Sequence, residues 1–152
     1  MNRHSRAGFT LIELLIVIAI IAILASLVLA ASRSVQAKGA RSRAEGEISA
    51  LAAALENYKA DNGDYPTNSV ANYSSPGNNS SLVTNLMPTN GGKVYYEFRS
   101  KSVSNNSYLD PFYNVYGYSY SGGISQNNGT NNYDLWSTAG NSANSNSWIK
   151  NW

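Results

Sequence analysis

The chain has 152 residues, of which 43% are hydrophobic and 13% are charged, and its formal net charge is +2. This length suits one domain, and so small a net charge gives no indication of nucleic-acid binding. The absence of cysteine excludes disulfides and thiolate chemistry, and the single histidine, His4, lies in the first eight residues. Beyond this short leader the commonest general base and the strongest nucleophile are both missing, so we expect no enzyme.

Residues 9–31 form an apolar run that only three polar residues interrupt, one of them Glu13. The run is long enough to cross a hydrocarbon core of about 30 Å as a helix. Arg3 and Arg6 precede it on a short leader and favour a cytoplasmic N-terminus. A secretory signal peptide cleaved within ASLVLAAS, residues 25–32, is the competing interpretation.

Glu13 is out of place in such a segment, because a carboxylate at the bilayer centre costs roughly 2.5–3.5 kcal/mol. The sequence around it, GFTLIELLIVIAIIAIL, spans residues 8–24. It resembles the N-terminus of type IV pilins and of the pseudopilins of type II secretion. The resemblance implies that residues 1–8 are a leader, that a prepilin peptidase cuts between Gly8 and Phe9, and that the new Phe9 amine is methylated.

After such a cut, the Phe9 amine and the Glu13 carboxylate are opposite charges at membrane depth, where a low dielectric strengthens their attraction. Within one chain they lie one helical turn apart. Between chains, Glu13 of an incoming subunit would meet the Phe9 amine of a subunit already assembled. The resemblance favours the pairing between chains, which makes Glu13 an assembly device; otherwise Glu13 only snorkels to the nearby membrane interface.

Residues 32–62 continue the helix as an amphipathic segment, with Ile48, Leu51 and Leu55 at spacings of three and four. Gly63 follows as a C-terminal cap, with a proline shortly beyond it, so we expect the helix to end near residue 62.

Residues 63–152 differ in composition from the helix, being rich in Asn, Ser, Tyr and Gly. The sequence predicts a short helical turn at 81–88 and strands at 93–98, 115–123 and 132–140, the last two paired as an antiparallel hairpin. The predicted fold class is therefore α+β: a long N-terminal helix, its first half transmembrane, packed against a small antiparallel sheet.

Tyr116, Tyr118 and Tyr120 alternate along the second of these strands. They are expected to form a sheet face against the long helix. The alternative is an exposed aromatic surface, which would suit a membrane-anchored carbohydrate-binding module.

Three later segments, ENYKADNGDYPT, YLDPFYNVYGYSY and YDLWSTAG, resemble the major pseudopilin branch of the family. That branch binds calcium in the loop after the last strand. Here Asp134 keeps the first acidic position, but Asn141 stands where the second would be expected. Calcium affinity grows with ligand charge, so the resemblance implies at most a weak calcium site; otherwise Asp134 holds a turn by hydrogen bonds.

The resemblance implies a structural subunit of a helical pseudopilus in type II protein secretion. The partners that it implies are further copies of the chain, the prepilin peptidase, minor pseudopilins, the assembly platform with its ATPase and the membrane, with no nucleic acid. It implies a single pass through the bacterial inner membrane, with the N-terminus in the cytoplasm and the C-terminal domain in the periplasm. The alternative is a type IV pilin of a surface fibre for adhesion, motility or DNA uptake; the missing C-terminal disulfide pair favours the pseudopilin.

Overall fold

The computed structural model describes residues 9–68, 73–74, 77, 79–121 and 127–152. The chain divides into two compact units, residues 1–38 and 39–152, and the first helix contributes residues to both. The expected leader, residues 1–8, lies outside the described residues.

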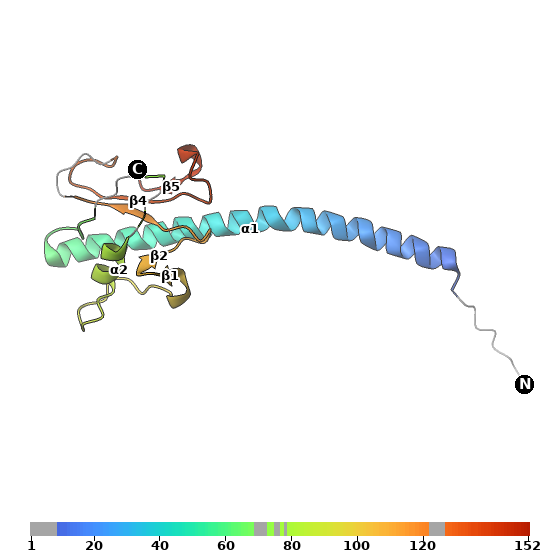
Figure 1. The fold of residues 1–152 in the computed structure, drawn as a ribbon, viewed down its shortest axis with the longest axis horizontal. Helices are drawn as coiled ribbons and strands as arrows, with labels where there is room; N and C mark the ends of the chain where they lie inside the picture. The colour runs from blue at the N-terminus through green and yellow to red at the C-terminus, as the bar shows by residue number, and fades with distance from the viewer. Residues whose placement is uncertain (1–8, 69–72, 75–76, 78, 122–126) are drawn as a thin grey trace, which may run out of the picture. The chain divides into compact units, whose positions relative to one another are not determined.

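The first helix, α1 (Leu11–Asn62), begins with the apolar run (Figure 1). Among the described residues, it is the one helix long and apolar enough to cross a membrane, judged by length and composition. Its most apolar window has a mean hydropathy of 3.2, and none of that window is buried within the chain. The predicted apolar N-terminal helix is confirmed.

The later turns of α1 belong to the second unit and bury one face. Ile48, Leu51 and Leu55 lie in the hydrophobic core, as their spacing predicts. The helix ends at Asn62, and Gly63 follows with φ of 87°, where its amide donates to the carbonyl oxygen of Lys59 at 2.8 Å. This left-handed cap suits glycine, because a side chain would be strained at that φ.

The second helix, α2 (Ser80–Leu86), confirms the predicted helical turn. The strand predicted at 93–98 is wrong, because that segment pairs with no strand. The amides of Tyr95 and Tyr96 both donate to the carbonyl oxygen of Leu86, at 2.8 and 3.2 Å. These two amides thus cap the last turn of α2. They are therefore not available to pair this segment with a β-strand.

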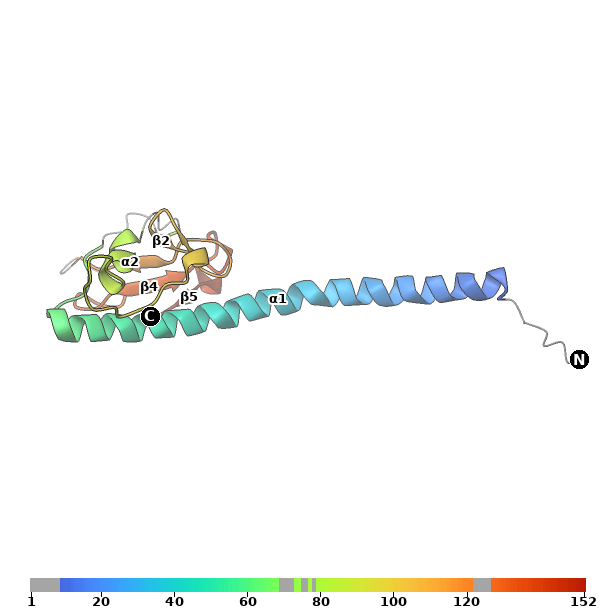
Figure 2. The ribbon, with the colours of Figure 1, turned by 90° about the horizontal axis from the view of Figure 1, so that it is seen from below.

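Two small antiparallel sheets complete the second unit, and in both views their strands lie beside the C-terminal part of α1 (Figures 1 and 2). In the first sheet, Asn105 and Asn106 form the turn between two strands with φ of 49° and 59°. Both values suit a tight hairpin turn. The first sheet pairs β1 (Val103–Ser104) with β2 (Ser107–Tyr108), and the second has the order β3 (Gly117–Ser119), β4 (Asp134–Ser137), β5 (Ile149–Lys150). Two short 3₁₀ turns are η1 (Ser100–Ser102) and η2 (Ser145–Ser147).

The predicted hairpin is confirmed in shorter form, since β3 pairs with β4 in the register Gly117↔Trp136. Residues 122–126 of its connection lie outside the described residues. A side chain at Gly117 would overlap the buried indole of Trp136. The Trp136 ring stacks on Tyr73 with centroids 4.5 Å apart, so the absence of a side chain at residue 117 makes room for it.

The tyrosines of the predicted alternating strand are buried, as expected for a face turned into the core. The Tyr116 hydroxyl donates to Glu47 Oε2 of α1 at 2.8 Å, and the Tyr118 hydroxyl donates to the carbonyl oxygen of Pro66 at 2.6 Å. Burial raises the pKa of Tyr116 and Tyr118, so both stay protonated donors. Because these rings are enclosed, they offer no platform for sugars. The predicted α+β class is confirmed.

Candidate assembly site

The N-terminus of α1 is closed by a reciprocal set of hydrogen bonds between Thr10 and Glu13. Glu13 Oε2 accepts from the Thr10 backbone amide at 2.8 Å and from the Thr10 hydroxyl at 2.7 Å. The Glu13 amide in turn donates to Thr10 Oγ1 at 3.3 Å. This is a capping box, which satisfies amides that the first turn of a helix leaves without partners. The carboxylate also lies at the positive end of the helix dipole.

The capping box occupies one oxygen of Glu13 and leaves the other available. Within the described part of the chain, Oε1 makes no hydrogen bond. The neighbouring Phe9 is 85% exposed, whereas Gly8 lies outside the described residues. The arrangement thus presents a carboxylate of fixed orientation, with one oxygen able to accept a bond from another molecule.

The rest of the first turns of α1 is an apolar surface that Ser26 alone interrupts up to Leu29. Its large side chains are exposed on every side of the helix, not on one stripe, so no face is set aside for water. An apolar area of this extent marks a surface for lipid or for other protein chains. Its exposed members include Leu11, Ile12, Leu14, Leu15, Ile16, Val17, Ile18, Ile20, Ile21, Ile23, Leu24, Leu27, Val28 and Leu29.

The predicted calcium ligand Asp134 is fully buried at the start of β4, and its carboxylate accepts bonds from protein donors. Oδ2 accepts from the Tyr73 hydroxyl at 2.7 Å and from the amide of Asn127 at 2.9 Å. Oδ1 accepts from the amide of Asn128 at 2.9 Å. The carboxylate therefore ties together two loop segments that are far apart in the sequence.

Asn141, the second predicted ligand, lies in an exposed turn and has different partners. Its side-chain oxygen accepts from the amide of Ala143 at 3.2 Å, and its carbonyl oxygen accepts from the Trp148 indole at 2.8 Å. Among the described residues, Asp134 and Asn141 share no hydrogen-bond partner. In the part of the chain that the structure describes, no three His, Cys, Asp or Glu side chains form a group that could hold a metal ion.

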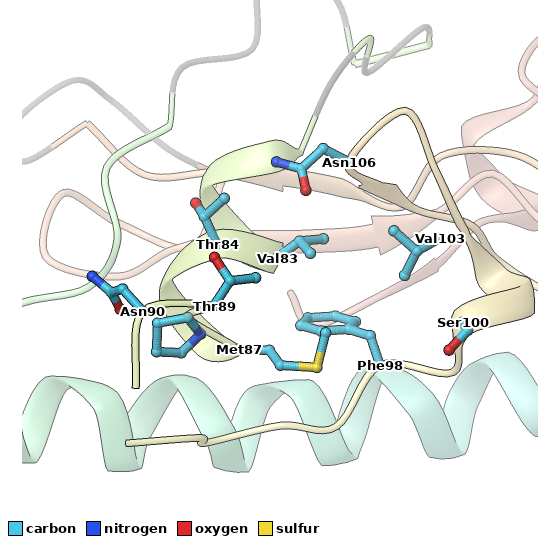
Figure 3. Close-up of a pocket in the computed structure, with 10 residues that line it drawn as sticks. Val83, Thr84, Met87, Thr89, Asn90, Phe98, Ser100, Val103 and Asn106 are labelled. Carbon is cyan, nitrogen blue, oxygen red and sulfur yellow. The ribbon is translucent and has the colours of Figure 1, made fainter. Parts of the chain in front are cut away.

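A hollow of about 520 Å³ lies beside α2, with Met87 and Phe98 at one side and Val83 at another (Figure 3). The ten residues that line it include no titratable side chain, so it offers no acid or base for catalysis. They are Val83, Thr84, Met87, Pro88, Thr89, Asn90, Phe98, Ser100, Val103 and Asn106.

Thr10 is the member of the assembly site that reasoning from the sequence missed. Its signal was present, since Thr followed three residues later by Glu ahead of an apolar run is the pattern of a capping box. The position of Glu13 in an apolar run suggested a partner in another chain, whereas Thr10, three residues before it, is its partner within the chain.

Residues 3–29 match the family model of the prokaryotic N-terminal methylation motif. This range contains Thr10, Glu13 and the exposed apolar turns of α1. The chain is a pilin-like protein with an N-methylation motif.

Curated relatives of this pilin-like protein carry the name type II secretion system core protein G. The protein from Pseudomonas aeruginosa is 49% identical over 69 residues, which cover 44% of this chain and 47% of the relative. The one from Klebsiella michiganensis is 46% identical over 67 residues, again 44% of this chain and 47% of the relative. The one from Escherichia coli is 47% identical over 60 residues, 40% of this chain and 41% of the relative. The match thus spans about half the length of these relatives or less, and no solved structure matches the chain.

Proposed function

We propose that the chain is a structural subunit of the pseudopilus of a type II secretion system and has no enzymatic role. The observation that carries this proposal is the match of residues 3–29 to the methylation motif, together with an apolar surface in the same residues that the chain itself does not cover. Two kinds of surrounding suit that surface, lipid before assembly and neighbouring copies of α1 afterwards. The name of the curated relatives supports the secretion branch over a surface pilus.

The proposal includes a processing step and a location. A prepilin peptidase removes residues 1–8 by cutting between Gly8 and Phe9, and the Phe9 amine is methylated. Residues 9–31 then anchor the chain in the inner membrane, with the N-terminus in the cytoplasm and residues 63–152 in the periplasm. Minor pseudopilins, the assembly platform and its ATPase are the proposed partners in building the fibre.

In assembly, Glu13 of one subunit pairs with the Phe9 amine of another. The free Oε1 supports this role, because the capping box already satisfies Oε2 and fixes the carboxylate at the start of the helix. A charge-assisted bond at that depth is stronger than it would be in water.

Glu13→Gln tests the pairing without removing the cap, because glutamine also serves at this position of a capping box. We expect the amount of fibre sheared from cells that express the assembly proteins to fall by at least about tenfold, a change of about 1.4 kcal/mol. The intact mass of the membrane-bound variant should still show a chain that begins at a methylated Phe9.

Glu45→Gln is the matched control, since Glu45 is an exposed acid of α1 whose ion pair with Arg41 lies at the surface. Such pairs contribute little, so its fibre yield should stay at the wild-type level. Wild-type fibre yield in the Glu13 variant would rule out the pairing, and a protein isolated with residues 1–8 intact would rule out the processing step.

A further inference from the structure

The hairpin of β1 and β2 brings two segments together at its open end. Because the strands are antiparallel, η1 before β1 and the turn after β2 must lie side by side. The amide of Leu109 donates to the carbonyl oxygen of Ser102 at 2.7 Å, which joins the two segments directly. Between them and Arg43 of α1 lies a pocket of about 500 Å³, here named the basic pocket. Its lining consists of Arg43, Arg99, Ser100, Lys101, Ser102, Leu109, Asp110 and Tyr113.

The cations of the basic pocket are mostly unpaired. Within the described residues, the side chains of Arg99 and Lys101 make no hydrogen bond or ion pair. Arg43 Nε lies 3.5 Å from Glu47 Oε1, which leaves the two terminal nitrogens of the guanidinium to face other groups. Three positive charges around one hollow repel one another, and an anion bound among them would relieve that repulsion.

The one acid in the lining, Asp110, is buried and already engaged. Its Oδ1 accepts from the amides of Phe112 and Asn114, both at 2.9 Å, and its Oδ2 accepts from the Ser137 hydroxyl. Burial also raises the pKa of the Asp110 carboxyl. The charged groups of the basic pocket that remain free to bind a ligand are therefore the hydrogen-bond donors of its arginine and lysine side chains.

The turn held by the hydrogen bonds of Asp110 also positions Tyr113, which lines the basic pocket. Tyr113 has φ of 65°, and the residue is 86% exposed. Its amide donates to the carbonyl oxygen of Asp110 at 2.9 Å, so the unusual backbone conformation is held from within the turn. Tyr113, Ser100 and Ser102 also line the pocket, and each of these side chains carries a hydroxyl group that can donate a hydrogen bond.

We propose that the basic pocket binds a phosphate group, carried by a phospholipid headgroup or by a soluble phosphate ester. A phosphate offers three or more acceptor oxygens to these donors, and the forked guanidinium groups of Arg43 and Arg99 match it in two-point contacts. The volume is in the range of small-molecule sites. The rings and methyl groups of Tyr113 and Leu109 add an apolar wall for the organic part of an ester. The proposal does not depend on the proposed role in secretion.

The test uses the full chain and two probes. Glycerol 3-phosphate is added to the chain in a non-ionic, phosphate-free detergent, and separately the chain is placed in nanodiscs of phosphatidylcholine with or without phosphatidylglycerol. Backbone amide shifts of residues 99–113 are followed by NMR. A response to glycerol 3-phosphate assigns the soluble source, and a response only to phosphatidylglycerol assigns the headgroup.

The double variant Arg99→Gln and Lys101→Gln removes the two unpaired cations, and the affinity for the responding probe should fall at least about tenfold. The matched control, Lys38→Gln with Lys150→Gln, removes the same charge from exposed positions outside the pocket. It should bind as the wild type does. No response to either probe, or an equal loss of affinity in the two double variants, would overturn the proposal.

Discussion

The two parts of α1 differ in where their apolar side chains find partners. In the first part, up to residue 38, the large apolar side chains are exposed. In the second part, Ile48, Leu51 and Leu55 are buried against the sheets and α2. The same secondary structure is therefore stabilised in two ways: the second part by contacts within the chain, and the first part by whatever surrounds it.

The acidic side chains of the two units also differ in whether their hydrogen-bond donors come from the chain itself. In residues 39–152 the buried acids have internal donors, as Glu47 has Tyr116 and Asp110 has Ser137. Among the described residues of the first unit, Oε1 of Glu13 has no donor. Glu47 and Asp110 thus have donors within residues 39–152, whereas the second oxygen of Glu13 is open to a donor from another molecule.

The sharpest test of this division applies one substitution in each part. Leu55→Ala should lower the free energy of unfolding of the second unit by about 3 kcal/mol, because it leaves a cavity in the core. Leu24→Ala, at a position that is 56% exposed, should leave that unfolding free energy unchanged. Urea titration of the full chain in detergent, followed by tryptophan fluorescence, measures both. Equal losses at the two positions would show that the first part also folds against the chain.

A smaller effect concerns the buried carboxyl of Asp110, whose pKa is raised in the folded state by burial. Between the unfolded pKa, about 3.9, and the higher folded value, the folded state holds more protons, so the contribution of Asp110 to stability falls as pH rises. Asp110→Asn removes this dependence. The stability of the wild type minus that of the variant should therefore decrease as the pH rises above about 4. A difference that stays constant or increases with pH would contradict the buried position.

The smallest expected effect is that of calcium. We propose that Asp134 acts as a hydrogen-bond acceptor for Tyr73, Asn127 and Asn128 and not as a ligand. A site with a dissociation constant of about 0.1–1 mM would add about 1.4–2.7 kcal/mol of stability at about 10 mM calcium. We expect no change in the melting temperature of the full chain on adding calcium or a chelator. An increase that Asp134→Asn abolishes would mean that the second unit needs an external partner after all.

Structural elements whose sequence pattern extends over many residues could be predicted from the sequence. The spacing that ends at Leu55 and the alternating tyrosines repeat a helical or a strand period. The apolar helix could be predicted from length and composition, and its end from Gly63 with the proline beyond it. In contrast, β1, β2 and β5 have two residues each, which is too short for any period to appear.

The strand wrongly predicted at residues 93–98 has a local cause. The segment 93–98 has strand composition, but the amides of Tyr95 and Tyr96 are used by Leu86. The bond from Tyr73 to Asp134 joins residues 61 positions apart. No spacing in the sequence indicates such a contact, because it exists only after the chain has folded.

The bare backbone at Gly117, which makes room for the indole of Trp136, has a practical consequence. The three tryptophans of the chain, at positions 136, 148 and 152, all belong to the second unit. The emission of Trp136 reports on a ring sealed from water and stacked on Tyr73. The molecule thus contains its own fluorescent probe, which reports the unfolding of residues 39–152 and lies outside residues 1–38.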